Sequence, residues 1–212
     1  MLLDFLAPPV CIACRHLLRA PPAGGVPPLC SRCAPELARL DPAARRVGDV
    51  EACFLYDGPL AAAVRRLKFV GELELAGPLG RLLAHAPVWR EGWDLVAPVP
   101  LHWRRALARG FNQAALLARW AAREHPTGAR LEPRLLQRTR ATTPQSELDG
   151  PARRENLAGA VVVRAGRSLV GRRVLVVDDV TTTGATLTAC LAAVRAAGAA
   201  RAAGLALLRS AL

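Results

Sequence analysis

Residues 174–185, VLVVDDVTTTGA, decide the fold of this chain. The apolar run Val174 to Val177 predicts a buried strand, and the carboxylates Asp178 and Asp179 are expected at its end. Small hydroxyl residues and Gly184 follow, and a helix is expected from about Thr186. The turn and the helix N-terminus offer backbone N–H groups and hydroxyls that suit a phosphate. Because adjacent carboxylates can accept hydrogen bonds from a vicinal diol, the stretch predicts a ligand that carries a ribose and a phosphate.

An ordinary helix N-cap is the alternative interpretation, since Asp before a Thr-rich turn favours a helix start. Two features argue against it. Asp178 and Asp179 are the only adjacent acidic pair in the chain, and four apolar residues precede them directly. One carboxylate is enough for a cap, and a second one beside it adds repulsion. The pair therefore favours a ribose-phosphate site at the carboxyl end of a strand, where open α/β sheets bind their ligands.

This stretch resembles the signature of the type I phosphoribosyltransferases, and further motifs extend the resemblance. Together with an N-terminal cysteine pair of pairs, they resemble the ComF family of phosphoribosyltransferase-like proteins, which is tied to DNA uptake in competent bacteria. The likeness covers roughly residues 8–210. The motifs, in order, are Tyr56-Asp57-Gly58, Leu67-Lys68-Phe69, Pro98 to His102, Arg109 to Gln113, Arg140 to Gln145 and Arg153 to Asn156.

The resemblance implies a site for phosphoribosyl pyrophosphate and Mg²⁺. It gives the ribose hydroxyls to Asp178 and Asp179, and catalytic roles to this pair, Lys68 and Arg109. The turn after the second strand, with Pro100, Leu101, Arg104 and Arg105, resembles the pyrophosphate loop. For His102, the role of a neutral hydrogen-bonding group is preferred over that of a general acid or base. The resemblance assigns the 5′-phosphate to a loop of four residues and to the helix start, namely Thr181, Thr182, Thr183, Gly184 and Thr186. Residues 138–157 resemble a hood that covers the site in the family. The hood residues at the family's positions are Arg140, Thr142, Gln145, Arg153 and Asn156.

Two CxxC pairs predict a metal site in the N-terminal part of the chain. Cys11 and Cys14 are separated from Cys30 and Cys33 by 15 residues, which is typical of a four-thiolate zinc ribbon. The segment between the pairs is too rich in Pro and Gly for a helix, so a metal is its expected organiser. Two disulfides are the alternative. A chain expected in the cytoplasm disfavours them. Four sulfur ligands leave no open position, so the zinc is expected to be structural.

Composition bounds the remaining possibilities. The 212 residues suit one α/β domain with a small appendage, and 52% of them are hydrophobic, enough for a core. No apolar run reaches the roughly 18 residues that a membrane span requires, and the first ten residues lack the basic start of a signal peptide. A cytoplasmic location is the default expectation. The net charge of +12 favours anionic partners such as phosphorylated sugars or nucleic acid, although a solvated basic surface explains it equally well.

The pattern along the chain predicts a zinc ribbon over residues 1–40 and a phosphoribosyltransferase-like domain over 41–212. Strands alternating with helices predict an α/β fold of the type I phosphoribosyltransferase kind, with a mostly parallel sheet and helices on both faces. Strands are expected at 50–56, 95–99, 160–163, 174–177 and 204–208, an extended segment at 131–137, and helices at 60–69, 73–84, 112–124 and 186–197.

Three functions compete at this point. The first is an enzyme that transfers a phosphoribosyl group to an acceptor that no residue identifies. The second is a non-catalytic module that binds single-stranded DNA or a DNA-uptake helicase, with aromatic residues stacking bases; filling the core is the preferred interpretation of those aromatics. The third is a sensor of nucleotide supply. The aromatic residues concerned are Trp89, Trp93, Trp103 and Phe111.

Overall fold

A six-stranded sheet forms the centre of the molecule, in the order β1-β2-β8-β7-β3-β4. The computed structural model describes residues 9–18, 28–37, 39–101, 107, 109–125, 128–139 and 159–210. The strands from β2 to β4 in this order run parallel to one another, and only β1 is antiparallel. Their bounds are β1 Arg46–Val47, β2 Val50–Leu55, β3 Leu95–Pro98, β4 Arg130–Leu131, β7 Arg173–Thr181 and β8 Arg201–Arg209.

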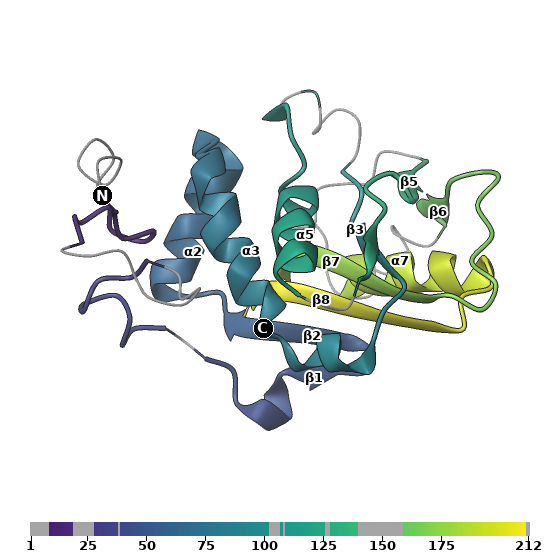
Figure 1. Ribbon diagram of the computed structural model, residues 1–212, viewed down its shortest axis with the longest axis horizontal. Coiled ribbons are helices and arrows are strands. Elements are labelled where there is room, and N and C mark those ends of the chain that lie inside the picture. Colours follow the sequence, from purple (N-terminus) through teal and green to yellow (C-terminus); the bar gives the residue numbers. More distant parts are fainter. Residues whose placement is uncertain are drawn as a thin grey trace.

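Helices cover both faces of this sheet, as Figure 1 shows. On one face, α2, α3 and α5 pack on the inward residues Leu175, Val177 and Leu205. On the other, α7 packs on Val174 and Val176, together with a separate antiparallel pair of strands. The bounds are α2 Gly58–Arg65, α3 Ala76–Ala84, α5 Gln113–Glu124 and α7 Ala185–Ala196, with the paired strands β5 Leu136–Arg138 and β6 Val161–Val163. The predicted α/β class with a mostly parallel sheet is confirmed.

Short helical turns link these elements. A π-helical turn, Arg66–Val70, continues α2 directly. It ends at Gly71, whose backbone has φ 80° and whose N–H bonds the carbonyl of Arg66 at 3.0 Å. A β-carbon disfavours such a positive φ, which is why glycine suits this position. The 3₁₀ turns are η1 Pro42–Ala44, η3 Leu73–Leu75 and η4 Pro87–Glu91.

Helices α3 and α5 lie unusually close together at Gly80. A β-carbon placed there would lie 2.4 Å from Cβ of Trp120 and 2.9 Å from the carbonyl oxygen of Leu117. At Gly77, one turn earlier, it would meet only the Trp120 ring at 3.4 Å. The contact therefore fixes the position of α5 relative to α3.

The structure corrects several predicted boundaries. The strand expected to end at Val177 runs through both acids to Thr181, because β8 offers a partner residue along that whole length. The segment expected to be extended over 131–137 divides into β4 and β5, with a turn at Pro133 between them. Strand β6 joins β5 outside the main sheet. The region before Val50, where no strand was predicted, contains η1 and the edge strand β1.

The cysteine-containing segment rests against the helices of the sheet. Ile12 is 3% exposed and belongs to the same apolar cluster as Leu60 and Leu67, and Leu29 and Leu37 pack against that cluster. Within the described ranges, no helix has the length and apolar character that crossing a bilayer requires.

Candidate functional site

The acid pair lies where the sheet changes direction of winding. From β3 the chain moves outward to β4, whereas from β7 it moves the opposite way to β8. In open α/β sheets ligands bind at such a switch point, outside the carboxyl ends of the two strands. The last pairing between β3 and β7 joins Pro98 to Val177. Beyond it, the strands that the structure describes pair β7 with β8 alone, so Asp178 and Asp179 extend past the end of β3.

Lys68 comes from the π-helical turn to meet the acids. Its Nζ lies 2.7 Å from Oδ2 of Asp179, whose side chain is 8% exposed against 21% for the lysine. The other oxygen of Asp179 accepts the N–H of Val180 at 2.8 Å, and Oδ1 of Asp178 accepts that of Asp179 at 2.9 Å. These bonds hold both side chains in place. The lone lysine of the sequence therefore neutralises one carboxylate of the pair.

Asp178 is the acid without that lysine contact, and it faces the α7 side of the sheet. Burial and then the negative charge of Asp179 raise the pKa of Asp178 to about 8, against the opposing effect of Lys68. A carboxyl group with that pKa exchanges its proton near neutral pH, so a cation or hydroxyl arriving at the pair changes its charge state. Cys190 of α7 lies close by: burial and then the charge of Asp178 raise the pKa of this thiol.

The turn after β7 forms a small polar recess at the start of α7. Gly184 precedes the helix with φ 77°, and Oγ1 of Thr183 accepts the N–H of Ala185 at 3.4 Å. The first turn of any helix has N–H groups without intrahelical partners and a partial positive charge, which favours an anion. The recess is lined by Asp178, Val180, Thr181, Thr182, Gly184, Ala185 and Thr186. The predicted phosphate loop and one predicted ribose-binding acid thus border the same space.

The chain leaves β3 beside the strand that carries the acids. Val99 donates its N–H to the carbonyl of Val177 at 2.8 Å, so Pro100 and Leu101 leave the sheet next to the acids. Asn112 fixes this exit, because its amide donates to the Val99 carbonyl at 3.0 Å while its oxygen caps α5. Arg109 lies over the ring of Phe69 at 5.3 Å and donates to Gln113.

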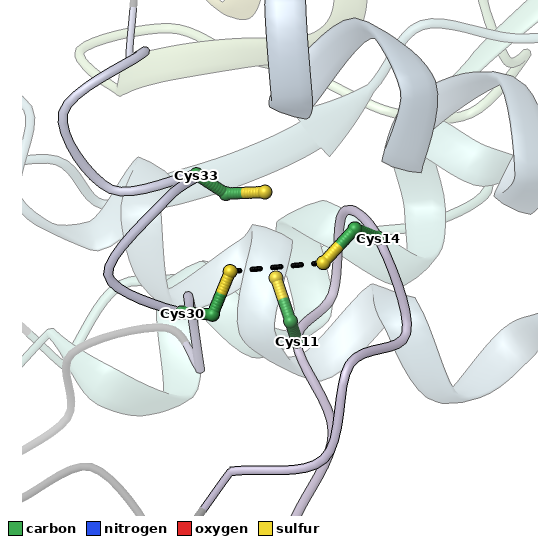
Figure 2. Close-up of side chains that lie close together, drawn as sticks. All are labelled: Cys11, Cys14, Cys30 and Cys33. Carbon is green, nitrogen blue, oxygen red and sulfur yellow. Dashed lines mark hydrogen bonds between the residues drawn. The ribbon is translucent and has the colours of Figure 1, made fainter.

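The four cysteines converge as the spacing predicts (Figure 2). Their sulfur atoms all lie within 4.8 Å of one another, and those of Cys14 and Cys30 are 3.6 Å apart. Tetrahedral zinc with Zn–S bonds of about 2.3 Å needs sulfurs about 3.8 Å apart, so the arrangement fits. The N–H of Cys33, followed by that of Arg32, lowers the pKa of Cys30 to about 6, which favours the thiolate that binds metal. His16 is not among the residues of the cluster.

Other predicted residues fall into two groups. Trp89 and Trp93 are 0% and 2% exposed, with each indole N–H bonded to a backbone carbonyl at 2.8 Å, so they fill the core as preferred and do not form a base-stacking surface. The second group lies outside the described residues: His102, Trp103, Arg104, Arg105 and the five hood residues Arg140, Thr142, Gln145, Arg153 and Asn156.

Sequence reasoning missed the contacts that join the cysteine segment to the site. Arg66 donates to the carbonyls of Ile12 and Ala13, which lie between Cys11 and Cys14. Glu72 pairs with Arg66 and with Arg15. The sequence carries no signal for these contacts, since nothing local relates Arg66 to residues at the start of the chain.

The chain is similar in sequence to known bacterial proteins. The chain is 36% identical to the DNA utilization protein YhgH of Salmonella typhimurium over 138 residues, which is 62% of this chain and 59% of that protein. It is 33% identical to competence protein F of Haemophilus influenzae over 141 residues, 62% of this chain and 60% of that protein. The chain is homologous to YhgH and competence protein F. It spans 59–60% of the length of these relatives.

The solved structures to which the chain is similar include phosphoribosyltransferases, each with a TM-score below 0.5. A hypoxanthine phosphoribosyltransferase from Trypanosoma cruzi, complexed with the product IMP, gives a TM-score of 0.39 at 15% identity and covers 65% of each chain. The hypoxanthine-guanine enzyme of L. donovani gives 0.38 at 17% identity, covering 63% of this chain and 67% of that one. No protein-family model matches the chain.

Proposed function

We propose that this protein binds phosphoribosyl pyrophosphate with Mg²⁺ and transfers the phosphoribosyl group to an acceptor during the use of imported DNA. The observation that carries the proposal is the acid pair at the β3–β7 switch point, with Lys68 at 2.7 Å and the polar recess of the α7 start directly after it.

The residues divide the ligand between them. Asp178 and Asp179 hold the ribose hydroxyls, and Thr181 to Gly184 with Thr186 hold the 5′-phosphate through hydroxyls and N–H groups. The turn at Pro100 and Leu101, together with Arg105 and Arg109, receives the pyrophosphate. Mg²⁺, when bound, screens the charge of that leaving group and keeps part of its own water shell. The zinc ribbon has a structural role, since four thiolates leave no open coordination position.

Calorimetry with phosphoribosyl pyrophosphate and Mg²⁺ tests the pocket. The double variant Asp178→Asn with Asp179→Asn removes both carboxyl groups from the diol, and the charge-assisted bond to Asp179 alone is typically worth about 1.5–3 kcal/mol, so affinity should fall at least about tenfold. The matched control is Asp49→Asn with Glu124→Gln, which removes the same charge from exposed positions on other elements. Undiminished binding by the site variant, or equal losses in both, would refute the ribose role.

A pyrophosphate-release assay then asks whether the protein turns over. Candidate acceptors, nucleic acid included, are added to the protein with phosphoribosyl pyrophosphate and Mg²⁺. Release that depends on one acceptor and is lost in the Asp178→Asn, Asp179→Asn variant supports transfer. Release at the same rate with water alone assigns the activity to hydrolysis.

A second candidate is a non-catalytic module for single-stranded DNA. The net charge of +12 and the names of the relatives, a DNA utilization protein and a competence protein, favour it. Phosphate contacts predict that the logarithm of affinity falls steeply and linearly with the logarithm of salt concentration. Absence of binding at low salt would exclude this function.

A further inference from the structure

We propose that Arg66 is a positioning residue that links the first cysteine knuckle to the Lys68–Asp179 pair, so that metal at the cysteines and sugar phosphate at the acids bind cooperatively. This inference rests on the proposed function and on a metal at the four cysteines. It adds a residue, Arg66, that touches neither ligand.

The first step is the contact between Arg66 and the knuckle. One guanidinium nitrogen lies 2.6 Å from the carbonyl oxygen of Ala13, and another donates to the carbonyl of Ile12. Both carbonyls belong to the two residues that separate Cys11 from Cys14. The side chain of Arg66 is only 20% exposed. A fork-shaped donor that binds two neighbouring carbonyls fixes the path of the knuckle, and the knuckle equally fixes the arginine.

Glu72 braces the same contact from the other end of the turn. Its carboxylate lies 3.1 Å from Nε of Arg66 and also pairs with Arg15, the residue after Cys14. Arg15 has φ 62°, which is uncommon for a residue with a side chain. The Glu72 side chain is 11% exposed and that of Arg66 is 20% exposed, so this pair is largely shielded from water, whereas the Arg15 side chain is 61% exposed. Knuckle, Arg66 and Glu72 therefore form one network across the boundary between the cysteine segment and the α/β domain.

The second step is the π-helical turn itself. Residues 66–70 form a turn wider than an α-helix, closed by the bond from Gly71 to Arg66. Such turns are rare and are often found at functional sites. Two residues apart on a helical turn, side chains leave in nearly opposite directions. Arg66 therefore reaches the knuckle while Lys68 reaches Asp179, and the geometry of one depends on that of the other.

The consequence is a thermodynamic link between two binding sites. When the cysteines lose their metal, the carbonyls of Ile12 and Ala13 are no longer held by a closed knuckle, and the turn loses its outer anchor. Lys68 then no longer holds Asp179 in the orientation that accepts a ribose hydroxyl. Because coupling is reciprocal, sugar phosphate at the acids must tighten metal binding by the same factor. A coupling of about tenfold lies within the usual range.

The test measures zinc affinity by competition with a chromophoric chelator, with Mg²⁺ alone and with Mg²⁺ plus saturating phosphoribosyl pyrophosphate. Wild-type protein should bind zinc about tenfold more tightly in the second case. In Arg66→Ala, and in Arg66→Lys if the alanine variant folds poorly, the ratio should fall to about twofold or less while one zinc still binds. The matched control is Arg195→Ala, because Arg195 also donates to a carboxylate and a carbonyl, at the far end of α7. It should keep the wild-type ratio.

Hydrogen exchange separates this inference from the proposed function. Removing zinc should raise the exchange rate of the amides over 66–72 in the wild type, whether or not any sugar phosphate is bound. Unchanged protection there overturns the inference, as does an equal affinity ratio in Arg66→Ala and wild type. If the wild-type protein binds no phosphoribosyl pyrophosphate, the proposed function and the cooperativity are both refuted. The hydrogen-exchange result then still decides whether the cysteine knuckle and the π-helical turn are linked.

Discussion

Replacing Lys68 by methionine tests the electrostatic structure of the acid pair. Methionine has an unbranched apolar side chain of similar length to lysine, so the substitution removes the positive charge and keeps most of the apolar contacts. At 2.7 Å, two unit charges attract by about 6 kcal/mol at an effective dielectric constant of about 20. Desolvation of the two groups opposes most of that gain. Breaking a buried pair typically costs about 3–5 kcal/mol, and the lysine is 21% exposed, so we expect a loss of about 2 kcal/mol.

The assay is urea unfolding of four proteins: wild type, Lys68→Met, Asp179→Asn and the double variant. In thermal unfolding, the same loss of about 2 kcal/mol corresponds to a fall in Tm of about 4–8 °C for a chain of this size. The double-mutant cycle should give a coupling energy of about 1–2 kcal/mol between the two positions. Changes that add to within about 0.3 kcal/mol would mean that the 2.7 Å contact contributes nothing, and the description of Asp179 as a neutralised acid would be wrong.

Three further predictions follow from the geometry. Because its pKa is raised to about 8, Asp178 keeps its proton in the folded protein at pH values where the unfolded chain has lost it. The free energy of unfolding should therefore fall as pH rises from about 4 to about 8. Urea unfolding of Asp178→Asn should not show this fall. In thermal unfolding, Gly80→Ala should destabilise the protein by about 1–3 kcal/mol, because its β-carbon would lie 2.4 Å from Cβ of Trp120. Gly77→Ala, whose β-carbon would lie 3.4 Å from the Trp120 ring, should be neutral or slightly stabilising. Equal effects of the two substitutions would contradict the close contact between the helices. Protein purified without chelator should hold about one equivalent of zinc, and chelation should lower its Tm; less than about half an equivalent would count against the ribbon.

Much of the fold was predictable because it depends on patterns of residues that are close together in the sequence. The strands predicted to begin at Val50, Leu95 and close to Val174 are all strands of the parallel sheet, and the spacing of the cysteines anticipated their convergence. The helix expected from Thr186 begins one residue earlier, after the glycine that the pattern placed there. These features depend on periodicity and on turn residues that act within a few positions of themselves.

What escaped prediction depends on partners distant in sequence. The continuation of β7 through Asp178 and Asp179 requires the equally long β8, and carboxylates in a strand argue locally for its end. The π-helical turn has no sequence signature, so the opposite directions of Arg66 and Lys68 could not be read from their spacing. The importance of Lys68 was expected only from a family resemblance, and its contact with Asp179 comes from the packing of α2 and its extension onto the sheet.

The two outermost strands, β1 and β4, are only two residues long. A long, flat outer strand presents a row of free backbone groups on which a neighbouring molecule can build. In the part of the chain that the structure describes, the two longest strands, β7 and β8, are interior to the six-stranded sheet, and the outermost strands present only short rows of backbone groups. Concentrated protein should therefore resist fibril-like growth along the sheet, and self-association would have to proceed through helical surfaces.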